Sequence, residues 1–306
     1  MNRIQPILVT GSHRSGTTWV GKMLAATPQV GYIHEPFNLR HRPGICTATF
    51  PCWFTYITEA NEALYYEPLK NTFAFRFSIK AELSAMHSPR VVRRMLENYK
   101  NFALYRLRHA APLIKDPLAL CSAEWLAKRF DMNVVVLIRH PAAFTSSIRR
   151  LNWRHNFAHF LNQPLLMRDY LAPFEADIRA FAQKEHEILD QATLLWRIIH
   201  HLISHYQAKH QDWLFLRHED LSAAPVPYFK YLYQHLHLTF SSRVQKVIEA
   251  YSSEDNPTEA ANHTLVKRNS KAIIKSWRTK FTAAELTHLR KQVEDISHLF
   301  YSDADW

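Results

Sequence analysis

The residues best placed to do chemistry are residues 11–19, which read Gly-Ser-His-Arg-Ser-Gly-Thr-Thr-Trp and follow the apolar run 6–10. Gly11 and Gly16 are separated by four residues and are followed by hydroxyl residues, which is the spacing of a phosphate-binding loop. A helix that begins at Thr17 points its free N–H groups at the loop, and its dipole favours a bound anion. The segment therefore predicts a site for a phosphate or a similar anion.

The cation of this loop differs from that of P-loop NTPases. Those enzymes carry a lysine that reaches the β- and γ-phosphates of a magnesium-bound nucleotide. Here Thr17 stands at that position, and Arg14 lies inside the loop. The change favours a different donor. A kinase or other NTPase with a degenerate loop is the alternative, with Asp116 as the carboxylate that would hold its metal.

A second pair of residues predicts another anion contact. The apolar run 133–138 is typical of a buried parallel strand and ends in Arg139-His140-Pro141. Because Pro141 suits the first turn of a helix, Ser147 is expected on that helix, eight positions after Arg139. A guanidinium at a strand's carboxyl end and a helix hydroxyl can converge on one phosphate. The alternatives are a surface ion pair for the arginine and a solvated serine.

Together these motifs resemble the donor site of sulfotransferases that use 3′-phosphoadenosine 5′-phosphosulfate (PAPS). Residues 14–19 are similar to the 5′-phosphosulfate loop of that family, and Arg139 with Ser147 resembles its 3′-phosphate site. Many members have lysine in place of Arg14, so this chain keeps the charge but replaces a point charge with a planar fork. The resemblance implies that Arg14 clamps the bridging oxygen and that Trp19 stacks on adenine. A core position in the first helix is the alternative for Trp19.

The resemblance extends along most of the chain. Residues 216–221 are similar to the family's Arg-Tyr-Glu-Asp-Leu element, with His218 in place of tyrosine and Glu219 interpreted as structural. Residues 267–270 resemble a basic segment that closes over the donor, and they supply Arg268 for the 3′-phosphate or, alternatively, a solvated charge. The family pattern thus implies that the donor is bound by His13, Arg14, Ser15, Gly16, Thr17, Thr18, Trp19, Arg139, Ser147 and Arg268.

The catalytic base is expected directly after the second strand, in the sequence His34-Glu35-Pro36. Attack of an alcohol on sulfur is helped when a positioned base removes its proton, and Glu35 stands where carbohydrate-type relatives carry a catalytic glutamate. His34 and a purely structural Glu-Pro turn are the alternatives. Lys115 is similar to a family lysine that stabilises charge on the transferring group, and an ion pair with Asp116 or Glu35 is its alternative role.

These expectations combine into one function, which is in-line transfer of a sulfuryl group from PAPS to a hydroxyl or amine acceptor. The product nucleotide is 3′-phosphoadenosine 5′-phosphate (PAP), and no metal is expected to be required. Aromatic residues in segments 41–63 and 152–175 favour the walls or lid of a pocket for a small-molecule or glycan acceptor, including glycolipids. A satellite hydrophobic cluster is the alternative for the first segment.

The element pattern predicts one α/β domain, residues 1–306, with a central parallel sheet flanked by helices as in P-loop-like sulfotransferases. Alternating strands and helices put ligands at the carboxyl ends of the strands. A helical stripe of apolar residues also runs through 177–209. Strands are expected at 6–10, 29–33, 112–115, 133–138 and 213–217, and helices at 17–27, 90–108, 122–130, 141–151, 225–237, 242–251 and 282–300.

Composition agrees with this fold class. Hydrophobic residues make up 47% of the 306 residues, which indicates a large core, and the net charge of +11 favours anionic partners. A nucleic-acid-binding protein is disfavoured because the lysine and arginine residues are scattered and no binding module is visible. We therefore expect no specific nucleic-acid partner.

Two further features bear on the class of protein. Cys46, Cys52 and Cys121 do not form a disulfide pattern, and Cys46 and Cys52 with His41 lack the second close pair of a typical zinc site. We expect no metal site. The first residues lead straight into a strand, and no run approaches the about 20 apolar residues of a membrane helix. A cytoplasmic enzyme is therefore expected.

Overall fold

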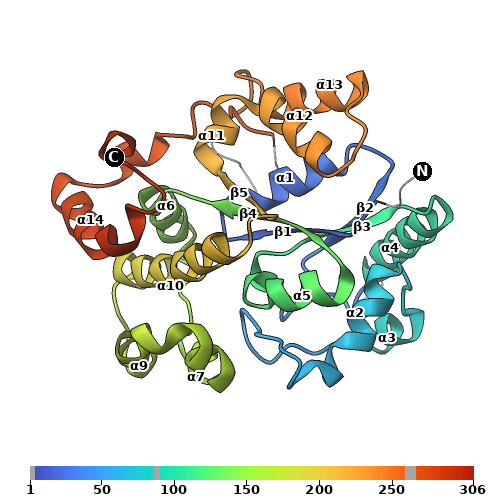
Figure 1. The fold of residues 1–306 in the computed structure, drawn as a ribbon, viewed down its shortest axis with the longest axis horizontal. Coiled ribbons are helices and arrows are strands. Elements are labelled where there is room, and N and C mark those ends of the chain that lie inside the picture. Colours follow the sequence, from blue (N-terminus) through green and yellow to red (C-terminus); the bar gives the residue numbers. More distant parts are fainter. Residues whose placement is uncertain (1–3, 86–89, 259–266) are drawn as a thin grey trace.

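Five short apolar runs form the strands of one parallel sheet at the centre of the protein (Figure 1). The computed structural model describes residues 4–85, 90–258 and 267–306. Its strands are β1 (Ile7–Gly11), β2 (Val30–His34), β3 (Ala111–Lys115), β4 (Asn133–Ile138) and β5 (Leu214–Arg217). They lie in the order β2-β3-β1-β4-β5, and every neighbouring pair is parallel. The predicted fold class is confirmed.

The strand order explains where a ligand can bind. β1 lies between β3 and β4, so connections run to one side of it early in the chain and to the other side later. In open parallel sheets, ligands bind outside the carboxyl ends of the strands at such a switch point. The loop that follows β1, residues 11–16, occupies this position.

Helices cover both faces of the sheet (Figure 1). On the upper face in this view lie α1, α11, α12 and α13, whereas α5 and α10 lie below it. The helix bounds are α1 (Thr17–Leu24), α2 (Tyr66–Phe73), α3 (Ile79–Ser84), α4 (Arg90–Leu107), α5 (Ala123–Phe130), α6 (Pro141–Leu151), α7 (Ala158–Leu161), α8 (Pro164–Leu166), α9 (Glu175–Gln183), α10 (Ile188–Lys209), α11 (His218–Ala223), α12 (Pro225–His235), α13 (Ser242–Ser252) and α14 (Ala283–Ser297).

Alternate residues of each strand build two separate cores. Ile7 and Val9 of β1 pack with the helices above the sheet, and Leu8 between them packs with those below. Successive strand side chains point to opposite faces, so a strand buried on both sides reads as a continuous apolar run. This burial fixes the strands and holds their carboxyl ends at one edge.

The structure adds helices that the sequence pattern did not predict. The stripe through 177–209 is interrupted and forms the end of α9 and the whole of α10, with residues 184–187 between the two helices. Two short helices, α2 and α3, lie between β2 and α4. Both span fewer than three turns, which is too short for a periodic pattern to stand out in the sequence.

Segments 41–63 and 152–175 pack against each other below the sheet. The backbone N–H of Tyr56 donates to Gln163 Oε1 at 2.8 Å, and the ring of Phe54 stacks on Phe160 with centroids 5.9 Å apart. Phe54 belongs to the main core below the sheet. The alternative of a separate satellite cluster is therefore wrong for this residue.

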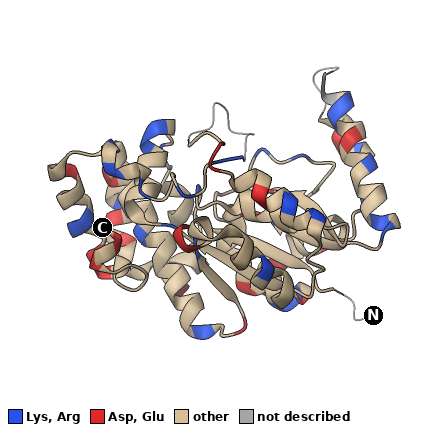
Figure 2. Cartoon of the chain, turned by 90° about the horizontal axis from the view of Figure 1, so that it is seen from above, with Lys and Arg blue, Asp and Glu red and all other residues tan. Residues whose placement is uncertain are grey.

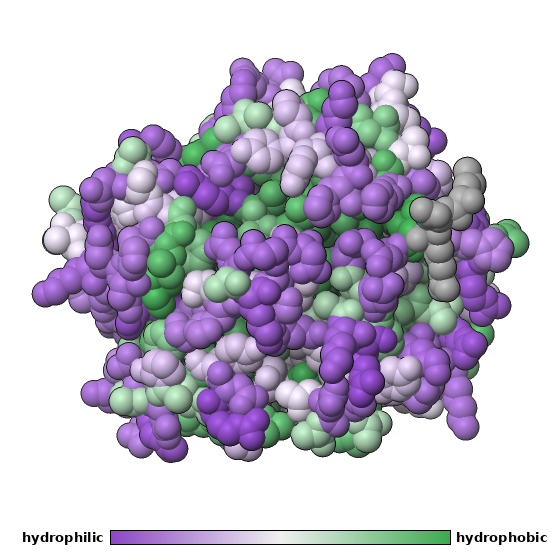
Figure 3. All heavy atoms as spheres, viewed as in Figure 1, coloured by the Kyte–Doolittle hydropathy of each residue, from purple (hydrophilic) through white to green (hydrophobic). Residues whose placement is uncertain are grey.

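The surface is polar over most of the face seen in Figure 3, and lysine and arginine residues are spread over many elements in Figure 2. Within the described ranges, no helix combines the length and the apolar character that crossing a bilayer demands.

The three cysteines are buried and free. Both ring nitrogens of His41 contact backbone carbonyl oxygens, those of Asn38 and Cys46, at 2.7 and 3.0 Å.

Gly11 is the position in this sheet that tolerates a side chain least. Its φ is +134°, and a Cβ there would lie 2.2 Å from the carbonyl oxygen of Leu137 on the paired strand β4. We predict that Gly11→Ala lowers the free energy of unfolding by about 3 kcal/mol, because backbone strain and a steric clash act together. Urea denaturation measures this change. Asn101→Ala, an exposed position on α4, is the control, and equal stability of the two variants would contradict the prediction.

Candidate active site

A cavity of about 250 Å³ lies at the carboxyl edge of the sheet, beside the residues that follow β1, β2 and β4. Most of the residues predicted from the sequence line it, namely His13, Arg14, Gly16, Thr17, Thr18, Trp19, Glu35, Arg139, Ser147 and Arg268. Ser15 is outside this lining and is buried, where its hydroxyl donates to the Ser12 carbonyl oxygen at 2.6 Å. Lys115 is also outside the lining.

The loop after β1 is built around the N-terminus of α1. Gly16, the residue that precedes α1, has φ +94° and provides no side-chain hydrogen bond to the helix. The first N–H groups of α1 therefore have no side-chain cap and are oriented toward the cavity end of the helix. A Cβ on Gly16 would lie 2.6 Å from the ring of His218, so the close packing of this ring requires glycine. The loop has the form of an anion cradle.

Arginine side chains concentrate positive charge beside this cradle. Arg14 Nε donates to Ser147 Oγ at 3.1 Å, and an Arg139 amino group donates to the Arg14 carbonyl oxygen. Burial lowers the pKa of Arg14 to about 10, and repulsion from Arg139, Arg150 and Arg268 adds to the shift. Among the described residues that line the cavity, Glu35 is the sole acid. A bound anion would relieve the mutual repulsion of these guanidinium groups.

The backbone of Arg139 is held firmly. The indole N–H of Trp196 on α10 donates to the Arg139 carbonyl oxygen at 2.9 Å. Burial lowers the pKa of Arg139, and the charge of Glu219 opposes that effect. Within the described part of the chain, the buried Nε of Arg139 has no hydrogen-bond partner. This donor is the kind of group that a phosphate oxygen satisfies.

Glu35 occupies a strained position at the end of β2. Its φ is +44°, and its backbone N–H donates to the Lys115 carbonyl oxygen at 2.9 Å. The side chain is 23% exposed, with Oε1 bound by the Lys115 ammonium group and Oε2 by Asn38 Nδ2 at 3.0 Å. Positive φ at a non-glycine residue persists only where the surroundings enforce it and is frequent at functional sites. These contacts hold the Glu35 carboxylate at the border of the cavity.

Lys115 lies behind Glu35 and away from the cavity. Its side chain is fully buried, and of the two ion pairs considered for it, the structure contains the one with Glu35. Burial raises the pKa of Glu35, but the charges of Lys115 and His34 and the hydrogen bonds from Lys115 and Asn38 outweigh it, so the pKa ends below its usual value. The carboxylate is therefore ionised at neutral pH.

Asp116 does not fill the role that an NTPase would require. It is fully buried, and its two carboxylate oxygens accept from the backbone N–H groups of Phe37 at 2.7 Å and Leu118 at 2.9 Å. Burial raises its pKa to about 7. Asp116 fixes the turn between β3 and a short 3-10 helix (Pro117–Ser122) and does not line the cavity.

His34 and Glu35 point to different surroundings, although they are adjacent. His34 is exposed, its ring lies 3.4 Å from the Tyr32 hydroxyl, and it does not line the cavity. Since β2 ends between them, only Glu35 turns toward the loop after β1. The geometry therefore favours Glu35 over His34 as a group that reaches a ligand.

Several aromatic side chains border the cavity, and Trp19, Trp53 and Trp153 lie near the loop that follows β1. Trp19 is only 8% exposed and packs edge-on against Phe229, so most of its indole is a core group whose edge reaches the cavity. Trp53 lies 5.8 Å from the ring of His13. The guanidinium carbon of Arg14 lies 5.8 Å from the ring of Trp153. The last two tryptophans thus flank the His13–Arg14 end of the loop.

Sequence reasoning missed several residues that also line the cavity. Arg150 is one turn beyond Ser147 on α6, and with Ala143 and Ser146 these residues share one helix face at spacings of three and four. That spacing could have predicted from the sequence that Arg150 shares a helix face with Ser147. Asn38 and Tyr251 gave no such signal, because their positions depend on loops and on packing between distant elements.

The chain was compared with known proteins. A family model described as "Sulfotransferase family" matches residues 6–242. The fold resembles the sulfotransferase domain from the Synechococcus PCC 7002 olefin synthase, with a TM-score of 0.51 and 15% identity over 99% of this chain and 97% of that domain. This likeness shows the fold.

Two further structures have lower scores. Sulfotransferase STF9 from Mycobacterium avium has a TM-score of 0.47 and 12% identity, over 98% of this chain and 78% of that protein. Mouse sulfotransferase SULT7A1, complexed with PAP, has a TM-score of 0.43 and 13% identity, over 99% of this chain and 88% of that protein. The comparison with curated proteins found no match.

The Lys115–Glu35 pair generates a direct prediction about protonation. Lys115→Met removes the cation that opposes the effect of burial, so the pKa of Glu35 should rise, and the free energy of unfolding should fall by about 3 kcal/mol, the lower end for breaking a buried pair. NMR titration of the Glu35 side-chain carboxyl carbon measures the pKa. Lys70→Met, which breaks an exposed ion pair with Glu67, is the control and should leave the Glu35 pKa unchanged. An unchanged pKa in Lys115→Met would contradict this account.

Proposed function

The chain belongs to the sulfotransferase family, and on that premise we propose that it transfers a sulfuryl group from PAPS to a hydroxyl acceptor and releases PAP. One observation carries the proposal. A carboxylate held by Lys115 and Asn38 shares a cavity with Arg14 and with the two residues that Arg14 contacts, Arg139 and Ser147. A base for the acceptor and cations for the two anionic groups of the nucleotide thus border the same space.

The donor fits this charge distribution. PAPS carries roughly four negative charges when its phosphomonoester counts as nearly two, and four arginines line the cavity, namely Arg14, Arg139, Arg150 and Arg268. We assign the 5′-phosphosulfate to the loop 11–16 and the N-terminus of α1, with Thr17 and Thr18 as hydroxyl donors. We assign the 3′-phosphate to Arg139, Ser147 and Arg268. Adenine would contact the exposed edge of Trp19.

The protein's own groups supply the other parts of the reaction. When bound, PAPS supplies the sulfuryl group. Glu35 accepts the proton of the acceptor hydroxyl, and the freed electron pair forms the new O–S bond as the bond from sulfur to the bridging oxygen breaks in line. Arg14 and the N–H groups of α1 stabilise the negative charge that develops on the leaving phosphate. Lys115 acts through Glu35 by keeping it ionised, which revises its expected direct contact with the transferring group.

Trp53 and Trp153 support a proposal for where the acceptor binds. Trp53 belongs to segment 41–63 and Trp153 to segment 152–175, and both line the cavity near His13 and Arg14. We assign these segments to the acceptor pocket, because flat aromatic walls stack on the apolar face of a sugar ring. The proposed acceptors are hydroxylated small molecules and glycans, including glycolipids. Incubation with labelled PAPS and a panel of such acceptors tests this assignment through label in the sulfated product.

Glu35→Gln tests whether Glu35, and not the neighbouring His34, is the catalytic base. The amide keeps the shape but cannot accept the proton, so turnover should fall by about 10²–10⁴-fold while PAP affinity is preserved. Because the pKa of Glu35 is lowered, wild-type activity should decline only as pH falls below the usual carboxylate range, and the variant should lack this acidic limb. The pH–rate profile measures both effects. His34→Ala is the control, and an inactive His34→Ala beside a normal Glu35→Gln would assign the base to histidine.

The 3′-phosphate assignment has its own test. PAP should bind with low micromolar or better affinity, about −8 kcal/mol, and Arg139→Ala should weaken it by about 1.5–3 kcal/mol because a charge-assisted contact is lost. Adenosine 5′-monophosphate (AMP), which lacks the 3′-phosphate, should bind wild type and variant alike in isothermal titration. If Arg139→Ala weakened the binding of PAP and AMP equally, the assignment of Arg139 to the 3′-phosphate would be wrong.

A further inference from the structure

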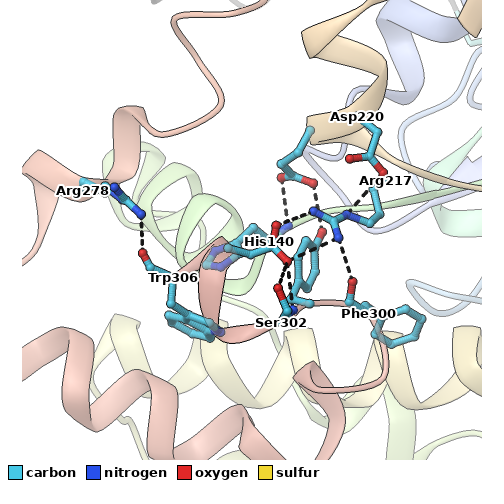
Figure 4. Close-up of polar contacts among 10 residues, drawn as sticks. His140, Arg217, Asp220, Arg278, Phe300, Ser302 and Trp306 are labelled. Atoms are coloured by element: carbon cyan, nitrogen blue, oxygen red, sulfur yellow. Dashed lines mark hydrogen bonds and ion pairs between the residues drawn. The ribbon is translucent and has the colours of Figure 1, made fainter.

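Residues 300–306 pack beside Arg217, at the carboxyl end of β5, and beside His140, which follows β4 (Figure 4). We call residues 300–306 the latch. Its anchor is Arg217 at the end of β5, which binds Asp305 Oδ1 at 2.6 Å and donates to the Phe300 carbonyl oxygen at 3.2 Å. Asp305 also accepts from the backbone N–H of Ser302 at 2.8 Å, a hydrogen bond within the latch.

A buried carboxylate connects the latch to the donor side of the cavity. The Tyr301 hydroxyl donates to Glu219 Oε2 at 3.0 Å, and the backbone N–H of His140 donates to Glu219 Oε1 at 3.1 Å. Tyr301 is 4% exposed, Glu219 8% and His140 1%, so water competes little for these bonds. His140 directly follows Arg139, and the peptide that joins them therefore has one of its ends fixed by Glu219.

Aromatic packing fixes the same peptide from another side. The ring of His140 stacks on Trp277 at 4.8 Å and meets the rings of Tyr301 at 4.9 Å and Trp306 at 4.6 Å. Burial lowers the pKa of His140 to about 3, so the ring is neutral. Its Nδ1 accepts from the Ala142 N–H and thereby caps α6. Trp277 also lines the cavity, so this packing is continuous with the site.

We propose that the latch positions Arg139 for the 3′-phosphate, with Tyr301 acting through Glu219. The inference rests on the proposed function. Trp196 holds the Arg139 carbonyl oxygen and Glu219 holds the next N–H, so the direction in which the guanidinium leaves the backbone is set from both sides. Glu219 keeps its orientation because Tyr301 occupies its second oxygen. The latch lies beyond residue 242, where the match to the family model ends.

Tyr301→Phe tests the latch with the smallest change. The variant keeps the ring beside His140 and Arg217 but loses the donor to Glu219. In isothermal titration, PAP affinity should fall about three- to tenfold, a smaller loss than in Arg139→Ala because Tyr301 acts on Arg139 only through Glu219, whereas AMP affinity should not change. The matched control is Tyr233→Phe. Its hydroxyl is also buried and donates to the Met23 carbonyl oxygen at 2.7 Å, on the other side of the sheet, so the ratio of PAP to AMP affinity should stay at the wild-type value.

Asp305→Asn provides a second variant that weakens the anchor at Arg217 from the surface, and it carries the test if Tyr301→Phe does not fold by circular dichroism. It should reduce the PAP to AMP ratio in the same direction. An unchanged ratio, or equal losses for PAP and AMP, would overturn the latch proposal. Arg139→Ala distinguishes failure of the latch from failure of the 3′-phosphate site. A selective PAP loss in Arg139→Ala without one in Tyr301→Phe refutes the latch alone, whereas no selective loss in Arg139→Ala refutes the 3′-phosphate site itself.

Discussion

Mutual repulsion among arginine side chains is the constraint on which the rest of this structure depends. Arg14, Arg139, Arg150 and Arg268 border one cavity beside the positive end of α1, and the repulsion contributes, with burial, to a lowered Arg14 pKa. Such an arrangement costs folding free energy unless packing holds the groups in place or an anion neutralises them. The sheet brings Arg14 and Arg139 together because parallel strands place their following residues at one edge, and Arg150 reaches the same cavity from α6. We propose that relief of this repulsion contributes to the affinity for a polyanionic nucleotide.

Glu35, the sole acid among the described residues that line the cavity, needs separate support to stay in place. Glu35 escapes pairing with the cavity arginines because Lys115 and Asn38 hold its two oxygens from behind and from the side. Its carboxylate therefore stays ionised and in place, which is what a general base requires. Asp116, the next acid along the chain from Lys115, is removed from the cavity by two backbone hydrogen bonds and by complete burial. Glu35 and Asp116 thus take different roles because Glu35 borders the cavity whereas Asp116 is completely buried.

Local patterns in the sequence were sufficient for the sheet and the loop. The apolar runs gave strands within one residue of their bounds, and the spacing of Gly11 and Gly16 placed the loop at the end of β1. Long-range contacts could not be predicted in the same way. Lys115 and Glu35 are 80 residues apart, and the direction of Lys115 away from the cavity depends on β2 and β3 being neighbours. Tyr301 and Glu219 are 82 residues apart, and the motif at 216–221 that contains Glu219 does not indicate which residue Glu219 contacts.

Ligand selectivity tests the central claim most directly, because a PAPS site and an NTPase site differ in both nucleotide and metal dependence. Isothermal titration of the full chain with PAP and with ATP, each with and without magnesium, separates the two. The account predicts that PAP binds tightly and equally in both conditions and that ATP binds more weakly, with no gain from magnesium. Magnesium-dependent ATP binding tighter than that of PAP would contradict it and would assign the loop to a nucleoside triphosphate.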